Sequence, residues 1–210
     1  MDRQQWDARY SGPELVWTST PNQYLVAEVA GARPGRAVDL ACGEGRNAVW
    51  LAEQGWGVTA VDFSPVGLAK GRLLAGERNV EITRVASAAQ EWTPPPEGFD
   101  LVAVFYLQLP QPERTVALKV AASAVAPGGT LLVVAHDVNN LTKGFGGPTN
   151  AEVLYRVTEV TQVAEAGGLT LQRAEQVTRV VQSDSGPREA IDTLVRVIRP
   201  GGGLGEGDRA

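Results

Sequence analysis

The sequence contains only one cysteine and one histidine among its 210 residues. A single cysteine excludes an intramolecular disulfide framework, and this pair of residues cannot form a Cys/His zinc site, so we expect no metal. No apolar run approaches the roughly 20 residues of a transmembrane helix. The polar first ten residues, MDRQQWDARY, lack the apolar stretch of a signal peptide. We therefore expect a cytoplasmic protein with no membrane partner.

An excess of basic residues is also missing, because 19 Lys and Arg stand against 24 Asp and Glu. The net charge of −5 gives no electrostatic reason to approach nucleic acid or an anionic membrane. Because no repeat or linker divides the chain, we expect a single domain over residues 1–200 and a disordered, glycine-rich tail over 201–210. The expected partner is a small-molecule substrate, and the expected assembly is a monomer or homodimer.

The most informative segment is DLACGEGRNA, residues 39–48. An apolar run precedes it, a helical pattern follows it, and a second apolar run over 57–61 ends at Asp62. This order of strand, glycine turn, helix, strand and acid is typical of a nucleotide-binding crevice in a parallel sheet. Gly43 and Gly45 are expected to let the backbone approach a ligand. Asp62 is expected to accept ribose hydroxyls from a strand tip outside the core, so the segment predicts an adenosine-type cofactor.

Strands and helices alternate along the rest of the chain. Strands are expected at 36–40, 57–62, 80–85, 99–107, 130–136, 169–181 and 189–198, and helices at 21–30, from the glycine turn to 54, and at 65–76, 112–126 and 157–166. Residues 1–30 are expected to form an N-terminal cap and a first helix that Thr20 caps, and residues 139–150 a long mobile loop. The last two strands are close enough to form a hairpin. The predicted fold is α/β: a doubly wound, seven-stranded Rossmann-like sheet with an antiparallel last strand and helices on both faces.

The run VDLACGEGRN, residues 38–47, resembles motif I of class I S-adenosylmethionine-dependent methyltransferases. Its D-x-x-C-G-x-G-R-N form resembles the tellurite-resistance and thiopurine methyltransferase branch. The aromatic segment WDARYSGPELVW, residues 6–17, is also similar to that branch, as are residues 104–107 and the loop 137–148. The resemblance covers about residues 6 to 198. It implies S-adenosylmethionine as cofactor and methyl transfer to a small-molecule nucleophile, either a thiol, a chalcogen oxyanion or an aromatic hydroxyl or amine.

The resemblance also implies a set of residues that would contact the cofactor. These are Trp6, Arg9, Tyr10, Trp17, Asp39, Ala41, Gly43, Gly45, Asp62, Phe63, Ala88, Ala89 and Phe105. Within this set, Arg9 would pair with the cofactor carboxylate, and Phe63 would lie against the adenine. Ala88 stands where many members have an Asp that accepts from the adenine amino group. Gln90, water or a backbone carbonyl would have to replace that acceptor here.

The substrate side would include Trp17, Tyr106 and His136, with Tyr106 and His136 as the candidate catalytic residues. His136 ends a predicted strand where ligands bind in such sheets, so an acid–base role stands beside a role in anchoring a loop. Tyr106 faces either the cleft or its wall. Cys42, in the tight turn, is interpreted as a small buried residue rather than a nucleophile, and Lys70 as a solvated helix position.

Two other classes of function stay open. The pattern Gly43-x-Gly45-x-x-Ala48 also fits the dinucleotide fingerprint, so an NAD(P)-binding Rossmann oxidoreductase is one alternative. A non-catalytic cofactor-binding protein, with its cleft closed by aromatic side chains, is the other. The final strand pair and the aromatic N-terminal segment favour a methyltransferase, as does the lack of a second substrate domain.

Overall fold

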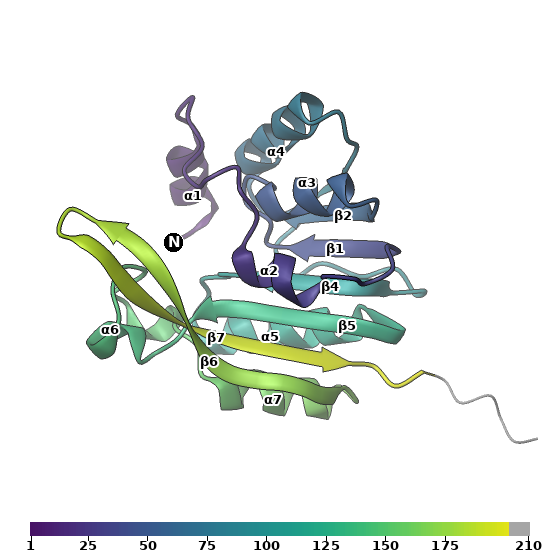
Figure 1. Ribbon diagram of the computed structural model, residues 1–210. Helices are drawn as coiled ribbons and strands as arrows, with labels where there is room; N and C mark the ends of the chain where they lie inside the picture. The colour runs from purple at the N-terminus through teal and green to yellow at the C-terminus, as the bar shows by residue number, and fades with distance from the viewer. Residues whose placement is uncertain (202–210) are drawn as a thin grey trace, which may run out of the picture.

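A seven-stranded sheet with the order β3-β2-β1-β4-β5-β7-β6 forms the centre of the computed structural model, which describes residues 1–201 (Figure 1). Its strands are β1 Arg36–Leu40, β2 Gly57–Asp62, β3 Thr83–Ala86, β4 Phe99–Phe105, β5 Val125–His136, β6 Thr170–Ser183 and β7 Gly186–Ile198. Strands β1 to β5 pair in parallel, and β7 runs antiparallel to both β5 and β6. The predicted Rossmann-like sheet with an antiparallel last strand is confirmed. The predicted tail lies outside the described residues from 202 onward.

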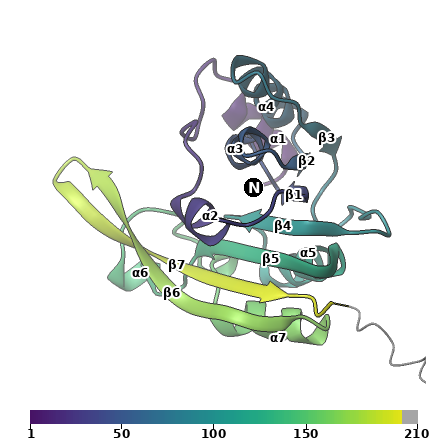
Figure 2. The ribbon, with the colours of Figure 1, turned by 45° about the vertical axis from the view of Figure 1, so that its right-hand side comes forward.

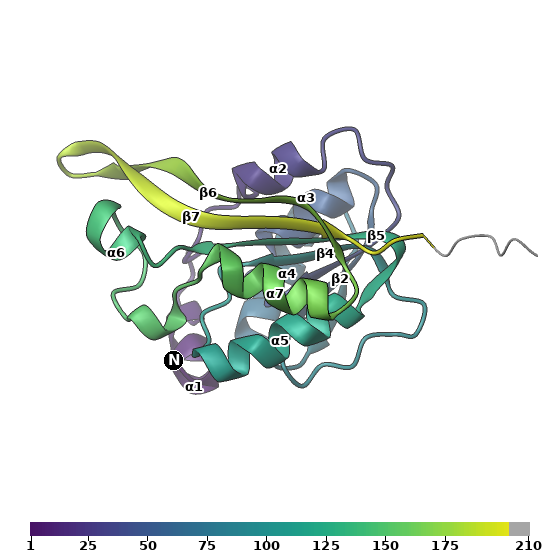
Figure 3. The same ribbon diagram turned by 90° about the horizontal axis from the view of Figure 1, so that it is seen from below.

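Helices cover both faces of the sheet, as predicted. They are α1 Arg3–Tyr10, α2 Gln23–Glu28, α3 Arg46–Glu53, α4 Pro65–Glu77, α5 Gln111–Ser123, α6 Asn140–Lys143 and α7 Val157–Ala166, with a 3-10 turn at Ala151–Val153. Helices α5 and α7 lie side by side on one face, and α2 lies on the opposite face (Figure 3). Within residues 1–201, no helix combines the length and the apolar character needed to cross a bilayer.

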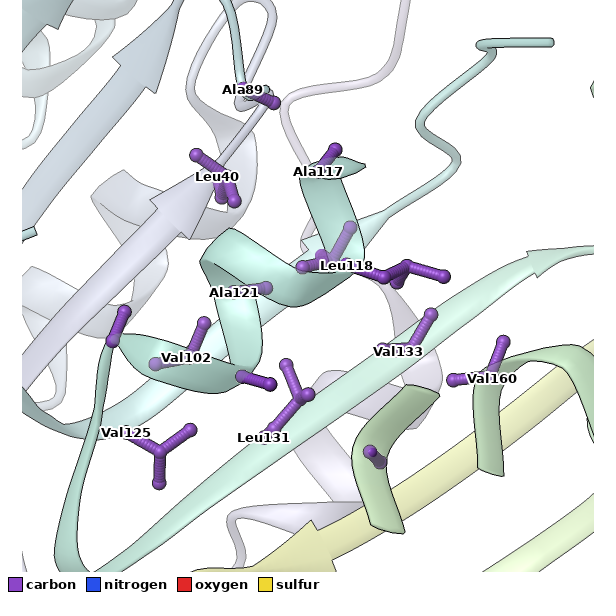
Figure 4. Packing of buried hydrophobic residues seen from close by; sticks show 14 of the residues in the cluster. Leu40, Ala89, Val102, Ala117, Leu118, Ala121, Val125, Leu131, Val133 and Val160 are labelled. Atoms are coloured by element: carbon purple, nitrogen blue, oxygen red, sulfur yellow. The ribbon is translucent and has the colours of Figure 1, made fainter. Parts of the chain in front are cut away.

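Strand β4 shows why the centre of the sheet is apolar on both faces. Val102 belongs to the core cluster under α5 and α7, and its neighbour Leu101 belongs to the cluster under α2 and α3. Successive side chains of a strand point to opposite faces, so a central parallel strand needs apolar residues at both positions. Figure 4 shows Val102 and Leu131 next to Leu118 and Ala121 of α5.

Several predicted boundaries are wrong for local reasons. Helix α2 is capped by Asn22, whose side chain accepts from the Tyr24 amide at 2.8 Å, and not by Thr20. Strand β5 begins at Val125 instead of residue 130, because Val125 pairs with Phe99 across a bulge. The predicted loop over 139–150 contains the short helix α6.

The β6–β7 hairpin extends past the end of β5. Strand β7 pairs with β5 only as far as His136 and Asp192, but its pairing with β6 continues to Ser183 and Gly186. The hairpin tip projects beyond the sheet, on the side where the parallel strands end (Figures 1 and 2). This extension brings part of β6 to the carboxyl edge of the sheet.

Candidate functional site

A cavity of about 850 Å³ opens where the parallel strands end. Its wall combines the N-terminal segment, the turn between β1 and α3, the ends of β2, β4 and β5, the loop 145–148 and the β6–β7 hairpin. Carboxyl ends of parallel strands meet at one edge of a sheet, and ligands of open α/β folds bind there. Twelve predicted site residues line the cavity: Trp6, Arg9, Tyr10, Trp17, Asp39, Ala41, Gly43, Asp62, Phe63, Phe105, Tyr106 and His136.

The glycines of the β1–α3 turn make room for other parts of the protein. Gly43 and Gly45 have φ values of 56° and 78°, which favour glycine. A Cβ on Gly43 would lie 2.9 Å from the Tyr10 hydroxyl, and a Cβ on Gly45 would lie 3.2 Å from the Cα of Gly71 in α4. The structure therefore places Gly45 against α4, whereas the sequence predicts that it approaches a ligand.

Asp62 fixes the glycine turn to the end of β2. Its Oδ2 accepts from the Gly43 amide and its Oδ1 from the Ser64 amide, each at 2.8 Å. The side chain is buried, which raises the pKa of this carboxyl, while the two amide donors lower it. The expectation that Asp62 lies outside the core is wrong. Each carboxylate oxygen still has lone-pair capacity for a further donor.

Asp39, in β1, has one carboxylate oxygen with no donor. Its Oδ2 accepts from the Ala48 amide at 3.1 Å, while Oδ1 has no hydrogen-bond partner within residues 1–201. Burial raises the pKa of Asp39 to about 7, because the charged form is poorly solvated there. A buried acceptor without a donor is unfavourable, so this atom is suited to a donor that a ligand supplies.

Glu44, between the two glycines, holds the N-terminal segment against the turn. Its buried carboxylate accepts from the amides of Val16 at 3.1 Å and Trp17 at 3.0 Å. It also accepts from Nζ of Lys70 at 3.0 Å. The expectation that Lys70 is solvated is wrong, since its side chain is only 12% exposed. One carboxylate thus joins the turn, the segment before α2, and α4.

The aromatic side chains of the N-terminal segment stack on one another at the cavity. The ring centroids of Trp6 and Tyr10 are 5.4 Å apart, and those of Trp6 and Trp17 are 6.4 Å apart. The Arg9 guanidinium lies over the rings of Trp6 and Trp17, at 5.5 and 5.1 Å. Burial raises the pKa of Tyr10, so its hydroxyl stays protonated. The segment forms a cover over the cavity.

Tyr106 and His136 meet at the buried side chain of Asp192, in β7. The Tyr106 hydroxyl donates to Asp192 Oδ2 at 2.8 Å and accepts from Asn22 Nδ2 at 3.3 Å. Arg179 Nε donates to the same Oδ2 at 2.7 Å. His136 Nδ1 lies 3.3 Å from Asp192 Oδ1, and its ring centroid is 4.6 Å from that of Tyr106. Burial and the charge of Asp192 both raise the pKa of Tyr106, so this hydroxyl acts as a hydrogen-bond donor.

Of the residues predicted to contact the adenine side of the cofactor, Phe63 and Ala88 border open space, and Ala89 lies in the core. Phe63 lines the cavity and also borders a second hollow of about 670 Å³, together with Ala88 and Gln90. Ala89 is 6% exposed and packs into the core near Leu40 (Figure 4). The structure therefore brings Ala88 to an open surface beside Phe63, and places Ala89 in the core.

Sequence reasoning missed three charged residues that line the cavity, Glu44, Arg46 and Arg179, and one buried acid behind its wall, Asp192. Only Asp192 carries a signal in the sequence, because it interrupts the otherwise apolar strand pattern around Ile191 and Leu194. A charge inside an apolar strand is costly unless it is paired, so it indicates a buried polar contact. The other three are ordinary charged residues until the fold brings their partners close.

Residues 37–129 match the protein family described as "Methyltransferase domain". A curated relative, the ubiquinone biosynthesis O-methyltransferase of Xanthomonas campestris pv. campestris (strain B100), is 33% identical over 133 residues, or 61% of this chain and 54% of the relative. The chain thus spans about half the length of the curated relatives it matches.

Solved structures share the fold. One described as "Conversion of a Disulfide Bond into a Thioacetal Group during Echinomycin Biosynthesis" has a TM-score of 0.74 and 21% identity, covering 94% of this chain and 92% of the other. Magnesium protoporphyrin IX methyltransferase from Synechocystis PCC 6803 with bound SAM has a TM-score of 0.62 and 16% identity, covering 94% and 79%.

The match over residues 37–129 contains the glycine turn, and the antiparallel β7 belongs to the fold that these solved structures share, so the findings agree with the resemblance to class I S-adenosylmethionine-dependent methyltransferases. The cofactor that the family match indicates is S-adenosylmethionine. An NAD(P)-binding oxidoreductase, the alternative that the glycine pattern leaves open, is not supported by these matches.

The raised pKa of Asp39 leads to a test by the substitution Asp39→Asn in the ligand-free protein. A folded-state pKa of about 7, above the unfolded value near 3.8, means that wild-type stability falls as the pH rises from about 4 to about 7. The neutral amide avoids this loss. Between pH 5 and pH 8, the stability of the variant relative to wild type should therefore rise by about 2.6 kcal/mol, measured by urea unfolding. Glu97→Gln, at an exposed acid, is the control; parallel curves for D39N and wild type would contradict the assignment.

The contacts of Glu44 lead to a test by amide hydrogen exchange. Glu44→Ala removes the acceptor for the Val16 and Trp17 amides, and one such hydrogen bond contributes about 1–1.5 kcal/mol. Exchange over residues 11–18 should therefore quicken by about tenfold, while exchange in β1 and β4 stays slow. Glu53→Ala is the matched control, because Glu53 forms a surface ion pair with Arg78. Unchanged exchange in E44A would show that the aromatic stack alone holds the segment.

Proposed function

We propose that this protein transfers the methyl group of S-adenosylmethionine to a small-molecule nucleophile in the cavity. The observation that carries the proposal is the cavity wall, which has buried acids at the ends of β1 and β2, an aromatic cover, and Tyr106 and His136 backed by the buried Asp192. The ubiquinone-pathway relative supports a small-molecule substrate. Within the class, the D-x-x-C-G-x-G-R-N motif and the aromatic segment support the tellurite-resistance and thiopurine branch.

The residues of the cavity fit this cofactor. Asp39 Oδ1, a buried acceptor without a donor in the described residues, suits a hydroxyl or ammonium donor. Asp62 would accept from the ribose, Arg9 would pair with the carboxylate, and Phe63 would lie beside the adenine. S-adenosylmethionine supplies a methyl group that its positively charged sulfur activates for displacement. The protein mainly has to align the reacting groups and exclude water.

His136 is the proposed general base. As the nucleophile attacks, its O–H, N–H or S–H bond breaks and the proton passes to Nε2 of His136, because Nδ1 faces Asp192. The buried carboxylate of Asp192 would stabilise the imidazolium that forms, as in other carboxylate–histidine pairs. Tyr106 stays protonated and would donate a hydrogen bond. Trp17, 36% exposed at the cavity, would contact the substrate.

Calorimetry with three ligands tests the cofactor assignment. S-adenosylhomocysteine and S-adenosylmethionine should bind with micromolar affinity, and NADH should not bind. Formation of S-adenosylhomocysteine with a panel of thiols, phenols, amines and chalcogen oxyanions then tests turnover. Binding of NADH alone would overturn the proposal in favour of an oxidoreductase, and cofactor binding without turnover on any panel member would favour a non-catalytic protein.

The role of His136 leads to a prediction for His136→Gln. Turnover of a phenol should fall by about 10²–10⁴-fold, the usual contribution of a general base. Turnover of an acidic thiol should fall much less, because such a thiol ionises in water without help. The affinity for S-adenosylhomocysteine should stay within twofold, which also shows that the variant is folded. Equal losses for phenol and thiol would assign His136 a positioning role only.

A further inference from the structure

Arg46 is a cation at the cavity without a matching negative charge. It is the first residue of α3, and its side chain lines the cavity. Its Nη1 donates to Thr18 Oγ1 at 3.4 Å, and no carboxylate of residues 1–201 lies within 4.0 Å of it. Desolvation lowers its pKa. The guanidinium is half-buried and partly desolvated, so an anionic group of a ligand in the cavity would find an unpaired cation there.

Arg179 is a second cation on the same cavity. It comes from β6, and only its Nε is used by Asp192, so within the described residues its Nη atoms have no hydrogen-bond partner. Its guanidinium lies 5.5 Å from the ring centroid of Tyr106. Asp39 and Glu44 raise the pKa of Arg46 and Arg179 lowers it, so the two guanidinium groups lie within electrostatic reach of each other at this cavity. An anion in the cavity that reached both guanidinium groups would be attracted by each.

The acids of the cavity do not supply this anion. Glu44 is paired with Lys70, and Asp62 accepts from two backbone amides. Asp39 accepts from the Ala48 amide through Oδ2, and its Oδ1, which has no donor in the described residues, forms no ion pair with Arg46 within 4.0 Å. Asp192 is already shared by Tyr106 and Arg179.

We infer that the methyl acceptor is a small organic acid, and that Arg46 and Arg179 bind its carboxylate or a comparable planar oxyanion. This inference rests on the proposed function and names the substrate class for the same cavity. A guanidinium fork matches a carboxylate with two parallel hydrogen bonds, which a lysine cannot reproduce. The acceptor's nucleophilic atom would then lie on another part of the molecule, toward His136. Arg9, stacked on Trp6 and Trp17, is left for the cofactor carboxylate.

Benzoate and benzamide are a matched pair of probes, since they differ mainly in charge. In the presence of saturating S-adenosylhomocysteine, benzoate should bind at least about tenfold more tightly than benzamide, as followed by tryptophan fluorescence. Arg46→Met should weaken benzoate at least about tenfold and leave benzamide unchanged. Arg46→Lys and Arg179→Lys, which keep the charge but remove the fork, should each weaken benzoate by about threefold or more. Arg72→Met, at an exposed position of α4, is the control and should change nothing.

Two results would overturn the inference. One is equal binding of benzoate and benzamide to the wild-type protein. The other is an R46M variant that binds S-adenosylhomocysteine more weakly but 5′-methylthioadenosine normally, because Arg46 would then hold the cofactor's own carboxylate. The proposed function fails separately, if the wild-type protein binds no S-adenosylhomocysteine. Benzoate binding that still depends on Arg46 would in that case support the anion site on its own.

Discussion

The buried carboxylate of Glu44 is the interaction on which the architecture of the cavity depends. A charge in this position is tolerated only because donors from three directions satisfy it, namely the Val16 and Trp17 amides and the Lys70 ammonium. On the other side of the same turn, Asp62 holds the Gly43 amide. The turn therefore has its shape before any ligand arrives, and the aromatic cover is attached to that turn rather than to the sheet.

The N-terminal region and the C-terminal hairpin both contribute to the part of the cavity wall around Tyr106 and His136. The Tyr106 hydroxyl contacts Asn22 from the N-terminal region and Asp192 from the C-terminal hairpin. Tyr24 adds a second link, because its hydroxyl donates to the Thr178 carbonyl at 2.6 Å. Tyr106 itself has a φ of 54°, which non-glycine residues adopt only where surrounding contacts hold them. The geometry at His136 and Tyr106 therefore requires both terminal segments to fold onto the finished sheet.

These dependencies explain what the sequence could predict. Periodicity and turn residues are local signals, so they predict β1, β2, the glycine turn and the final antiparallel pair well. The contacts of Glu44 span 27 and 28 residues, and the bond between Tyr106 and Asp192 spans 86, so no local pattern reveals either. Gly45 shows a subtler limit. The motif indicates that Gly45 has a close neighbour. Only the folded structure shows that this neighbour is Gly71 of α4, whereas the sequence predicts a ligand.

Asp39 shows how the cavity differs from the rest of the core. Elsewhere along β1 the buried residues are apolar, but here a carboxylate oxygen is buried without a donor in the part of the chain described, and its pKa rises to about 7. An asparagine or an alanine would suit the ligand-free protein better. A buried acceptor without a donor lowers the stability of the ligand-free protein. Such a residue is typical of a binding site, where the ligand supplies the missing donor. Arg46 lines the same cavity with the opposite charge and has no carboxylate within 4.0 Å among the described residues. In the proposals made above, Asp39 would meet a donor of the cofactor near β1, and Arg46 would meet an anionic group of the methyl acceptor near α3 and the hairpin.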